Sequence, residues 1–538
     1  MNKLFAQLVE KRHLSEAFLH PKYENLTDPF ELNDMDKAVF RVEKALNNHE
    51  KILIYGDYDV DGVTASTLME QALILAGANP ENIEIMLPDR FADGYGMSPR
   101  LIERAKNNQI TLVITVDCGS KNHAIIDELN TLSINTIITD HHECADTLPE
   151  AVAVVNPHRQ DKPTPILQNL AGVGVVFKTA QALVKRGLIV DGQEKWLLDL
   201  VLLGTICDNM LLTGENRILG YFGVKVLAKT RRPGLRELMR TANVKRITSD
   251  SIGFQLGPRL NAAGRLETAE LSLELLRTNA NTEATTIAAR LEELNKKRRL
   301  EQRAATEEIA HREQKNEPVI IETGNFHEGI LGIVAGRLVE EFHKPAFVLT
   351  EIDGGILKGS GRSFGDFNLA EALSFVKNII ISGGGHAGAA GVKLEQKSLF
   401  EFREKINEYY RSLHLVEQEN YFKSHAELET TNLGDISLEL IENLKLLEPF
   451  GAGNEEPVIC IKDAEIVETR RMGDQGQHLR IDLRGKDGKI LKCVAFSAPE
   501  AWFNLDNNET YDFLIKPVEN EWNGTRSVEA RLIDVVMV

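Results

Sequence analysis

Cysteine is scarce in this sequence, and long apolar runs are missing. The 538 residues contain five cysteines and no Cys-x-x-Cys pair, which argues against both a disulfide framework and a zinc ribbon. No uninterrupted apolar stretch is long enough to span a bilayer. The opening residues, "MNKLFAQLVEKRHLSEAF", are interrupted by charge before any long apolar run, unlike a signal peptide. We therefore expect a soluble, cytoplasmic protein with no membrane partner.

A surplus of positive charge is also absent, because the net charge is −18 and the pI is about 5.4. Affinity for phosphate backbones comes largely from Lys and Arg, so this composition alone disfavours a nucleic-acid partner. Net charge averages over the whole surface, however, and a basic channel can lie within an acidic shell. No Walker sequence is present, which argues against a nucleotide-driven motor. The question of a nucleic-acid ligand therefore stays open.

What the sequence does contain is a regular α/β pattern between residues 51 and 155. Runs rich in Ile and Val, such as "KILIY", "TLVITV" and "NTIIT", alternate with helical patterns, which predicts a parallel sheet with helical crossovers. Ligands of such sheets bind beyond the carboxyl ends of the strands. Acidic residues and histidines follow several predicted strands and one later buried helix. They are Asp57, Asp59, Asp61, Asp117, Asp140, His141, His142 and Asp208.

These side chains are the ligands that hard or borderline divalent cations prefer. A single Asp after a strand is commonly a turn or N-cap residue, but a converging set of carboxylates without cations would destabilise the fold. The set is larger than one ion needs, and two ions roughly 3.5–4 Å apart would use it. We therefore expect two divalent cations, Mn²⁺ or Mg²⁺. The zinc site that Cys118, Cys144 and Cys207 suggest is disfavoured, since small buried cysteines are common.

The remainder of the chain predicts further parts. "GPRLNAAGRL", residues 257–266, is interpreted as a glycine-rich loop. Residues 282–315 lack Gly and Pro, which predicts one long connecting helix. A second α/β unit begins near "EPVIIETGNF" and ends near "GGGHAGAAGVKL". Alternating segments such as "HLRIDLRG" and "KILKCVAF", separated by polar turns, predict a small β-barrel at the end.

A resemblance now becomes specific. "DYDVDG", "VDCGS", "DHH" and "GTICDN" occur in this order and resemble the successive motifs of the DHH phosphoesterase superfamily. "LPDRFADGYG", "GPRLNAAGRL", "FHEGILGIVAGRL", "GSGRS", "GGGHAGAAG" and "LEPFGAGNEEP" are similar to motifs of the RecJ single-stranded-DNA exonucleases. The resemblance implies an α/β fold: a parallel-sheet DHH domain, joined by a long helix to a second α/β domain (DHHA1), with a C-terminal OB-like barrel.

The domain boundaries that follow are also predictions. They are an N-terminal extension (1–45), the DHH catalytic domain (46–230), a connecting region with the long helix (231–315), the DHHA1 domain (316–415) and the OB-fold nucleic-acid-binding domain (416–538).

The resemblance also implies roles for individual residues. The implied metal ligands are Asp59, Asp61, Asp117, His141 and Asp208, with Asp117 as the catalytic bridge and Asp57 beside them as a ligand or its neighbour. His142 is implied to face the scissile phosphate; a structural partner that orients His141 is the alternative. The implied 5′-phosphate pocket contains Arg90, Ser360 and Arg362. Further implied DNA contacts are Arg259, Asn261, Arg265, His327, Gly384, Gly385 and His386. The alternative is a surface salt bridge for Arg90 and Arg362, a structural loop beside the sheet for Arg259, Asn261 and Arg265, and a structural role for each histidine.

By this resemblance the protein is expected to remove nucleotides from the 5′ end of single-stranded DNA in repair and recombination. A DHH phosphodiesterase acting on short RNA or cyclic dinucleotides is the nearest alternative, and an inactive DNA-binding scaffold is a further one. The expected partners are single-stranded DNA, a single-strand-binding protein and a helicase, and the chain is expected to be a monomer.

Overall fold

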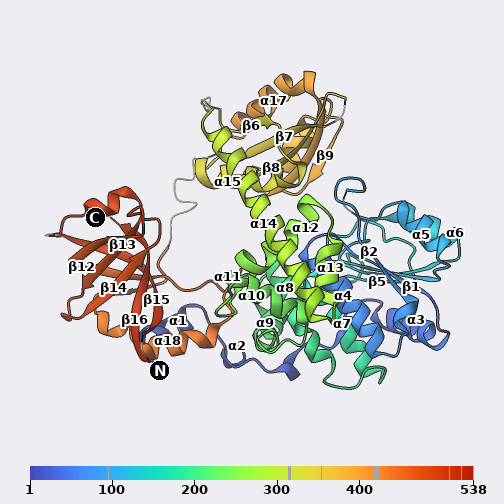
Figure 1. Ribbon diagram of the computed structural model, residues 1–538, viewed down its shortest axis with the longest axis horizontal. Helices are drawn as coiled ribbons and strands as arrows, with labels where there is room; N and C mark the ends of the chain where they lie inside the picture. Colours follow the sequence, from blue (N-terminus) through green and yellow to red (C-terminus); the bar gives the residue numbers. More distant parts are fainter. Residues whose placement is uncertain are drawn as a thin grey trace. The chain divides into compact units, whose positions relative to one another are not determined.

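A computed structural model describes residues 1–94, 96–312, 317–352, 354–415, 425–507, 509–522 and 524–536. The chain divides into two compact units (Figure 1). One comprises Met1–Thr27, Asn209–Val224 and Phe422–Val538, and the other comprises Asp28–Asp208 and Lys225–Tyr421. Across the described ranges, no helix is both long enough and apolar enough to cross a membrane.

The larger unit contains the predicted parallel sheet. Its strands are β1 (Ile52–Tyr55), β2 (Ile83–Met86), β3 (Leu112–Val116), β4 (Asn135–Thr139) and β5 (Ala153–Val155), in the order β2-β1-β3-β4-β5. All neighbouring strands are parallel, so every carboxyl end lies at the same edge. This confirms the predicted sheet. The edge strand β2 was not predicted from the sequence.

Helices cover both faces of this sheet. On one face, α5 (Arg100–Asn107) and α6 (His123–Thr131) pack against apolar side chains of β1, β3 and β4. The opposite face is covered by α3 (Met35–Asn47), α4 (Val60–Leu75) and α7 (Gly172–Lys185). The helix α8 (Leu198–Cys207) packs against α4 and α7 and carries Asp208 at its end. Both α4 and α8 are buried nearly all round, which explains their continuous apolar sequence.

The segment at residues 257–266 is the helix α12 (Gly257–Leu266), so the predicted glycine-rich loop is wrong. Its glycines serve close packing instead. A Cβ on Gly257 would lie 2.5 Å from Cys207 Sγ, and one on Gly264 would lie 3.0 Å from the Tyr58 carbonyl oxygen. A π-helical turn, Ile252–Leu256, leads into α12. The neighbouring helices are α10 (Pro233–Thr241), α11 (Ser249–Ser251) and α13 (Glu270–Arg277).

The predicted long helix is α14 (Asn281–Ala310), which is confirmed, while residues 313–315 of that prediction lie outside the described ranges. It leads to a second sheet in the order β6-β7-β8-β10-β9, as expected for the second α/β unit. Its strands are β6 (Ile320–Gly324), β7 (Ala346–Ile352), β8 (Ile356–Arg362), β9 (Ser382–Gly385) and β10 (Ala389–Glu395). The accompanying helices are α15 (Leu331–Phe342), α16 (Leu369–Phe375) and α17 (Leu399–Ser412).

The smaller unit contains the predicted barrel. Its strands follow the order β11-β12-β13-β14-β16-β15, and an additional β12–β15 pairing closes five of them into a ring. They are β11 (Leu428–Thr430), β12 (Ile459–Met472), β13 (His478–Arg484), β14 (Ile490–Ala495), β15 (Thr510–Trp522) and β16 (Thr525–Val536). The helices α1 (Lys3–Lys11), α2 (Glu16–Leu19) and α18 (Leu438–Leu444) belong to the same unit. Leu4, Phe5 and Leu8 of α1 lie in the barrel's core cluster.

Arg217, on α9 (Gly214–Leu227), is buried in this unit, and no carboxylate of the described residues accepts a hydrogen bond from it. Its guanidinium donates to the carbonyl oxygens of Phe18, Leu446 and Glu448, at 3.2, 2.8 and 2.5 Å. The ring of Phe18 also lies 4.8 Å from the guanidinium carbon. One side chain therefore joins the N-terminal segment to the segment that precedes β12.

Gly204→Ala tests the close packing of α8. The new methyl group would lie 2.6 Å from both Asp61 Oδ1 and Val173 Cγ1, so we expect a loss of about 1–3 kcal/mol in the free energy of unfolding. Gly336→Ala, in α15, is the matched control because its Cβ would meet nothing closer than 3.9 Å. Thermal and denaturant unfolding of both variants should show a loss for the first alone; equal stability would contradict the packing described for α8.

Candidate metal and phosphate site

The turn between β1 and α4 positions three carboxylates. Asp59 is the N-cap of α4, and its side chain accepts a hydrogen bond from Gly62 N at 3.1 Å. Asp61 lies in the first turn of α4, where it accepts from Gly172 N at 2.6 Å and Val173 N at 2.9 Å. Because those amides begin α7, the onset of one helix holds the acidic residue of another. Asp57 is buried before them.

Asp117 and Asp208 approach from the ends of β3 and α8. Asp117 has a φ of 61°, in the left-handed region, and its backbone N donates to the Thr139 carbonyl oxygen at 2.9 Å. Its carboxylate is confined by Gly172, where a Cβ would lie 2.6 Å from Asp117 Oδ1. Asp208 is the C-cap of α8, and its side chain is about one third exposed.

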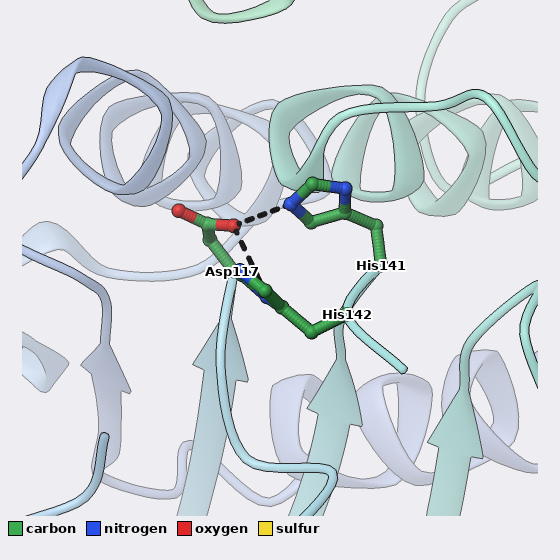
Figure 2. A group of neighbouring side chains, drawn as sticks. All are labelled: Asp117, His141 and His142. Atoms are coloured by element: carbon green, nitrogen blue, oxygen red, sulfur yellow. Dashed lines mark ion pairs between the residues drawn. The ribbon is translucent and has the colours of Figure 1, made fainter. Parts of the chain in front are cut away.

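The two histidines at the end of β4 face Asp117 from the neighbouring strand end (Figure 2). His141 Nε2 lies 3.1 Å from Asp117 Oδ1, 3.6 Å from Asp208 Oδ2 and 3.7 Å from Asp61 Oδ2. His142 Nδ1 lies 2.8 Å from Asp140 Oδ1 and 3.9 Å from Asp117 Oδ1. One imidazole nitrogen therefore faces three carboxylates at once.

Asp140 positions the two histidines through hydrogen bonds. Its carboxylate accepts hydrogen bonds from the backbone N of Ser120, His141 and His142, at 3.0, 2.8 and 3.1 Å. Burial alone would raise the pKa of Asp140, but the hydrogen bond and charge of His142 hold it well below its usual range. Burial alone would lower the pKa of His142, whereas the contact with Asp140 raises it to about 9. Asp140 therefore orients His142 and keeps it protonated in the metal-free protein.

Ionising the remaining carboxylates is strongly unfavourable, because they are buried close to one another. Burial and the charge of Asp59 raise the pKa of Asp57 to about 8 and that of Asp61 to about 7. Burial and the nearby Asp61 and Asp59 raise the pKa of Asp208 to about 8. Burial and several neighbouring carboxylates raise the pKa of Asp117 well above its ordinary value. The site therefore favours positive charge at its centre.

The donor set fits divalent cations. Ligand atoms lie within 4.8 Å of one another in each of two groups, Asp57 with Asp59 and Asp117, and Asp61 with His141 and Asp208. Burial and His142 lower the pKa of His141 to about 4, so its ring is neutral at physiological pH. Among the described residues Asp117 Oδ1 accepts no hydrogen bond although it is buried, while Nε2 of this neutral ring lies close to it. A cation held by these residues would satisfy both atoms.

A pocket of about 620 Å³ adjoins this cluster. His142 and Asp140 line it from the parallel sheet, and Lys358 lines it from β8. Of the residues predicted to contact DNA, it is lined by Arg90, Ser360, Arg362, Gly384, Gly385 and His386. The structure therefore brings the predicted 5′-phosphate residues together beside His142, and their roles stay predictions.

Two guanidinium groups in this region, those of Arg90 and Arg362, form no ion pair with a carboxylate of the described residues. Arg362 donates to Ser360 Oγ at 3.2 Å and to the Gly361 carbonyl oxygen at 2.8 Å, and Arg90 lies over the Tyr58 ring at 4.7 Å. Gly332 makes room for them, because a Cβ there would lie 2.8 Å from Arg362 Nη2. Burial and the proximity of Arg90 lower the pKa of Arg362. The pocket is therefore suited to an anion.

"GGGHAGAAG" forms a hairpin of β9 and β10 in the described chain, with the turn at residues 386–388. Gly385 has a φ of 151°, and a Cβ there would lie 2.3 Å from the Ala389 carbonyl oxygen. The position therefore requires glycine for the turn itself, in addition to any access it gives to the backbone.

Four predicted DNA contacts are absent from the described lining of this pocket: Arg259, Asn261, Arg265 and His327. Arg259 pairs with Glu292 Oε2 at 2.6 Å and donates to the Gln255 carbonyl oxygen at 2.7 Å, so both of these contacts are structural. Asn261 lies on α12. His327 accepts from Gly329 N at 3.1 Å and packs edge-on against Phe91.

Arg265 differs from these residues because the charges of Arg90 and Arg362 act on its guanidinium. Its guanidinium donates to the Gly329 carbonyl oxygen at 3.3 Å. Burial and the charges of Arg90, Arg298 and Arg362 lower its pKa to about 9. Arg265 thus adds positive potential behind the pocket without lining it.

Lys358 is a pocket residue that the sequence interpretation missed. It pairs with Glu328 at 2.7 Å and precedes Ser360 by two positions on β8. Side chains two apart on a strand share a face, so Lys358, Ser360 and Arg362 were findable together from the period of the strand.

Family models match three separate parts of the chain. They are the DHH family N-terminal domain over residues 51–205, the DHHA1 domain over 316–412 and the RecJ OB domain over 429–534. A Dickeya dadantii protein named single-stranded-DNA-specific exonuclease RecJ is 32% identical over 98% of this chain and 94% of its own length. This chain belongs to the RecJ family. A Bacillus subtilis protein of the same name is 34% identical over 99% of this chain and 68% of its own length.

Solved RecJ structures agree with this membership. The crystal structure of Thermus thermophilus RecJ in complex with Mn²⁺ matches with a TM-score of 0.84 at 27% identity, over all of this chain and 76% of that one. A crystal structure of exonuclease RecJ bound to manganese matches over 72% of this chain and 96% of that one, with a TM-score of 0.62 at 29% identity. The DHH, DHHA1 and OB-like parts of the fold are therefore those of the RecJ family.

Metal removal should make the stability of this RecJ family member depend on pH. Asp57, Asp61 and Asp208 have folded pKa values of about 7–8 against 3.8 for the free side chain, so near neutrality the metal-free folded state binds more protons than the unfolded state. Its free energy of unfolding therefore falls as the pH rises from about 6 to 8. Thermal melts in chelator should show a lower midpoint at the higher pH.

Mn²⁺ replaces those protons, so the stabilisation it gives should be larger at the higher pH. Asp57→Asn removes one of the shifted groups, and this variant should show a weaker pH dependence in chelator. A midpoint of the chelated protein that rises between these pH values would contradict the electrostatic description of the site.

Proposed function

We propose that this protein is a metal-dependent exonuclease that hydrolyses single-stranded DNA from its 5′ end and releases 5′-mononucleotides. The observation that carries the proposal is the arginine and serine pocket beside the acidic and histidine cluster, with His142 lining the pocket. The names of the two relatives described above are those of exonucleases specific for single-stranded DNA. Membership in a family of DHH phosphoesterases supports hydrolysis at phosphorus.

Binding begins at the end of the strand. Arg90, Ser360 and Arg362 hold a terminal 5′-phosphate, for which planar guanidinium groups and a hydroxyl are suitable donors. The stack of Arg90 on Tyr58 and the bonds from Arg362 to Ser360 and Gly361 orient the two guanidinium groups before the ligand arrives. A preorganised pocket of this kind fixes the register, so the next phosphodiester bond lies at the acidic cluster.

The carboxylates and histidines perform the remaining positioning. Asp57, Asp59 and Asp117 would hold one cation, and Asp61, His141 and Asp208 a second, with Asp117 placed between the groups. When bound, such cations stabilise the charge of an in-line displacement at phosphorus and lower the pKa of water. His142, oriented by Asp140, presents an N–H to the scissile phosphate or its leaving oxygen.

A phosphodiesterase acting on dinucleotides is the competing activity for the same cluster. The RecJ OB match over residues 429–534 favours a longer strand, because OB folds bind extended single strands. Roles in DNA repair and recombination, a single-strand-binding protein, a helicase and the monomeric state stay predictions.

End-labelled DNA tests this function directly. Purified protein is incubated with single strands labelled at either end, in Mn²⁺, Mg²⁺ or chelator, beside blunt duplex and a dinucleotide. We expect metal-dependent release of mononucleotides from the 5′ label first, with duplex cleaved far more slowly. Retained DNA binding without cleavage in any metal would indicate a binding scaffold, and preference for the dinucleotide would indicate the competing phosphodiesterase.

Arg362→Ala tests the 5′-phosphate pocket. The variant should raise KM for 5′-phosphorylated strands about tenfold or more and leave 5′-hydroxyl strands almost unaffected, because the lost guanidinium acts on the terminal phosphate. Arg337→Ala is the matched control, since Arg337 is exposed on α15 and pairs with Glu340. Steady-state kinetics with both strand ends measure the difference. An equal loss on both substrates would place Arg362 elsewhere on the strand.

A further inference from the structure

An exposed aromatic side chain lies beside the acidic end of the site. Phe254 is 79% exposed, although it belongs to the well-packed turn Ile252–Leu256 that leads into α12. This turn is π-helical, a conformation that is rare and often occurs at functional sites. Folding gains nothing from keeping a phenylalanine ring in water, so packing does not explain this position.

The turn is packed against the helix end that carries Asp208. A Cβ on Gly253 would lie 3.9 Å from Ile206 Cγ2, and one on Gly257 would lie 2.5 Å from Cys207 Sγ. Residues 206 and 207 directly precede Asp208 on α8. The glycines on both sides of Phe254 thus bring its backbone against the residues next to a predicted metal ligand.

Arg259 holds the turn in position through one hydrogen bond and one ion pair. Arg259 donates to the Gln255 carbonyl oxygen at 2.7 Å and pairs with Glu292 on α14 at 2.6 Å. Lys296, 69% exposed, reaches the same Glu292 at 3.7 Å. Arg259 and Lys296 therefore share one carboxylate, and Arg259 is also bonded to the residue that follows Phe254. An exposed ring with a surplus positive charge nearby is the combination that binds single strands without base readout.

Under the proposed function, the direction of the bound DNA strand places the ring of Phe254 on its 3′ side. His142 lines the pocket that contains Arg90 and Arg362, whereas Asp208 is absent from the described lining of that pocket. His141 lies between them, with Nε2 3.6 Å from Asp208 Oδ2. Under the proposed function, a DNA strand whose 5′-phosphate lies in the pocket would pass His142, then His141, and would then leave past Asp208 toward Phe254.

We propose that Phe254 is a stacking platform for a base of single-stranded DNA on the 3′ side of the scissile phosphate, with Lys296 beside an adjacent phosphate. This inference rests on the proposed exonuclease function, and it adds a contact that holds the downstream strand in register. Arg259 is then a positioning residue for the turn, not a DNA contact.

Binding in chelator tests the platform without turnover. The full chain is titrated with 5′-phosphorylated oligothymidylate carrying a 3′ fluorophore, and with a series in which one base at a time is replaced by an abasic site. Phe254→Ala should weaken binding by about five- to hundredfold, the range that one base–aromatic stack supplies. Phe254→Trp should restore it. Phe400→Ala, on α17 and 75% exposed, is the matched control and should bind as the parent protein does.

The abasic series gives the decisive comparison. In the parent protein one abasic position on the 3′ side should weaken binding, and Phe254→Ala should lose this sensitivity because the two changes remove the same contact. Unchanged affinity of Phe254→Ala, or an abasic profile that is the same in both proteins, would overturn the inference.

Hydrolysis separates this inference from the proposed function. A 5′-phosphorylated dinucleotide whose second nucleoside is abasic lacks every base on the 3′ side of the scissile phosphate, so Phe254→Ala should cleave it in Mn²⁺ at the parent rate while its KM for the long strand rises. A loss on the dinucleotide equal to that on the long strand would overturn the stacking role. If the parent protein cleaves neither substrate in any metal, the proposed function fails, and the binding comparison still decides the platform.

Discussion

Mutual repulsion between buried carboxylates is the constraint around which the larger unit is built. Asp61 and Asp117 are almost fully enclosed, and their raised pKa values show that the fold alone does not balance their charge. The protein offsets part of the cost with the amides that begin α7 and with the charge of His142. Close approach of α4, α7 and α8 is needed for this arrangement, so the packing that stabilises the unit also forms the ligand cluster.

A group of mutually repelling arginines lies next to the carboxylates. Arg90, Arg265 and Arg362 repel one another, and burial lowers the pKa values of the latter two. The two clusters act on each other, since Arg90 lowers the pKa of Asp57 and Asp59 raises that of Arg265. Cations suit one cluster and a phosphate suits the other. In the proposed function, the terminal phosphate lies at the arginines and the next phosphate lies at the cations that the carboxylates would hold.

The acidic edge was predictable because the residues follow strands of one parallel sheet, and strand ends meet at one edge whatever the side chains between them. The edge strand β2 was missed because it has only four residues and includes Glu84. The helix α12 was mistaken for a loop because its glycines suggested turns, whereas their function is contact with Cys207 and Tyr58.

The roles of individual arginines were harder to predict. The pairing of Arg259 with Glu292 spans 33 positions, and no local pattern predicts it. Motif resemblance could place Arg90 and Arg362 in one pocket, but only the three-dimensional arrangement shows that Arg265 acts from behind it.

The core shared by α1 and the C-terminal barrel has a consequence for the order in which the chain matures. Asn2 bonds to Asn443 across 441 positions, and Arg217 joins the carbonyl groups of Phe18 and Glu448. On a ribosome, the first helix therefore leaves the exit tunnel long before its partners have been synthesised. Leu4, Phe5 and Leu8 stay without their native neighbours until the barrel strands have been synthesised, so the smaller unit can complete its core only after the larger one.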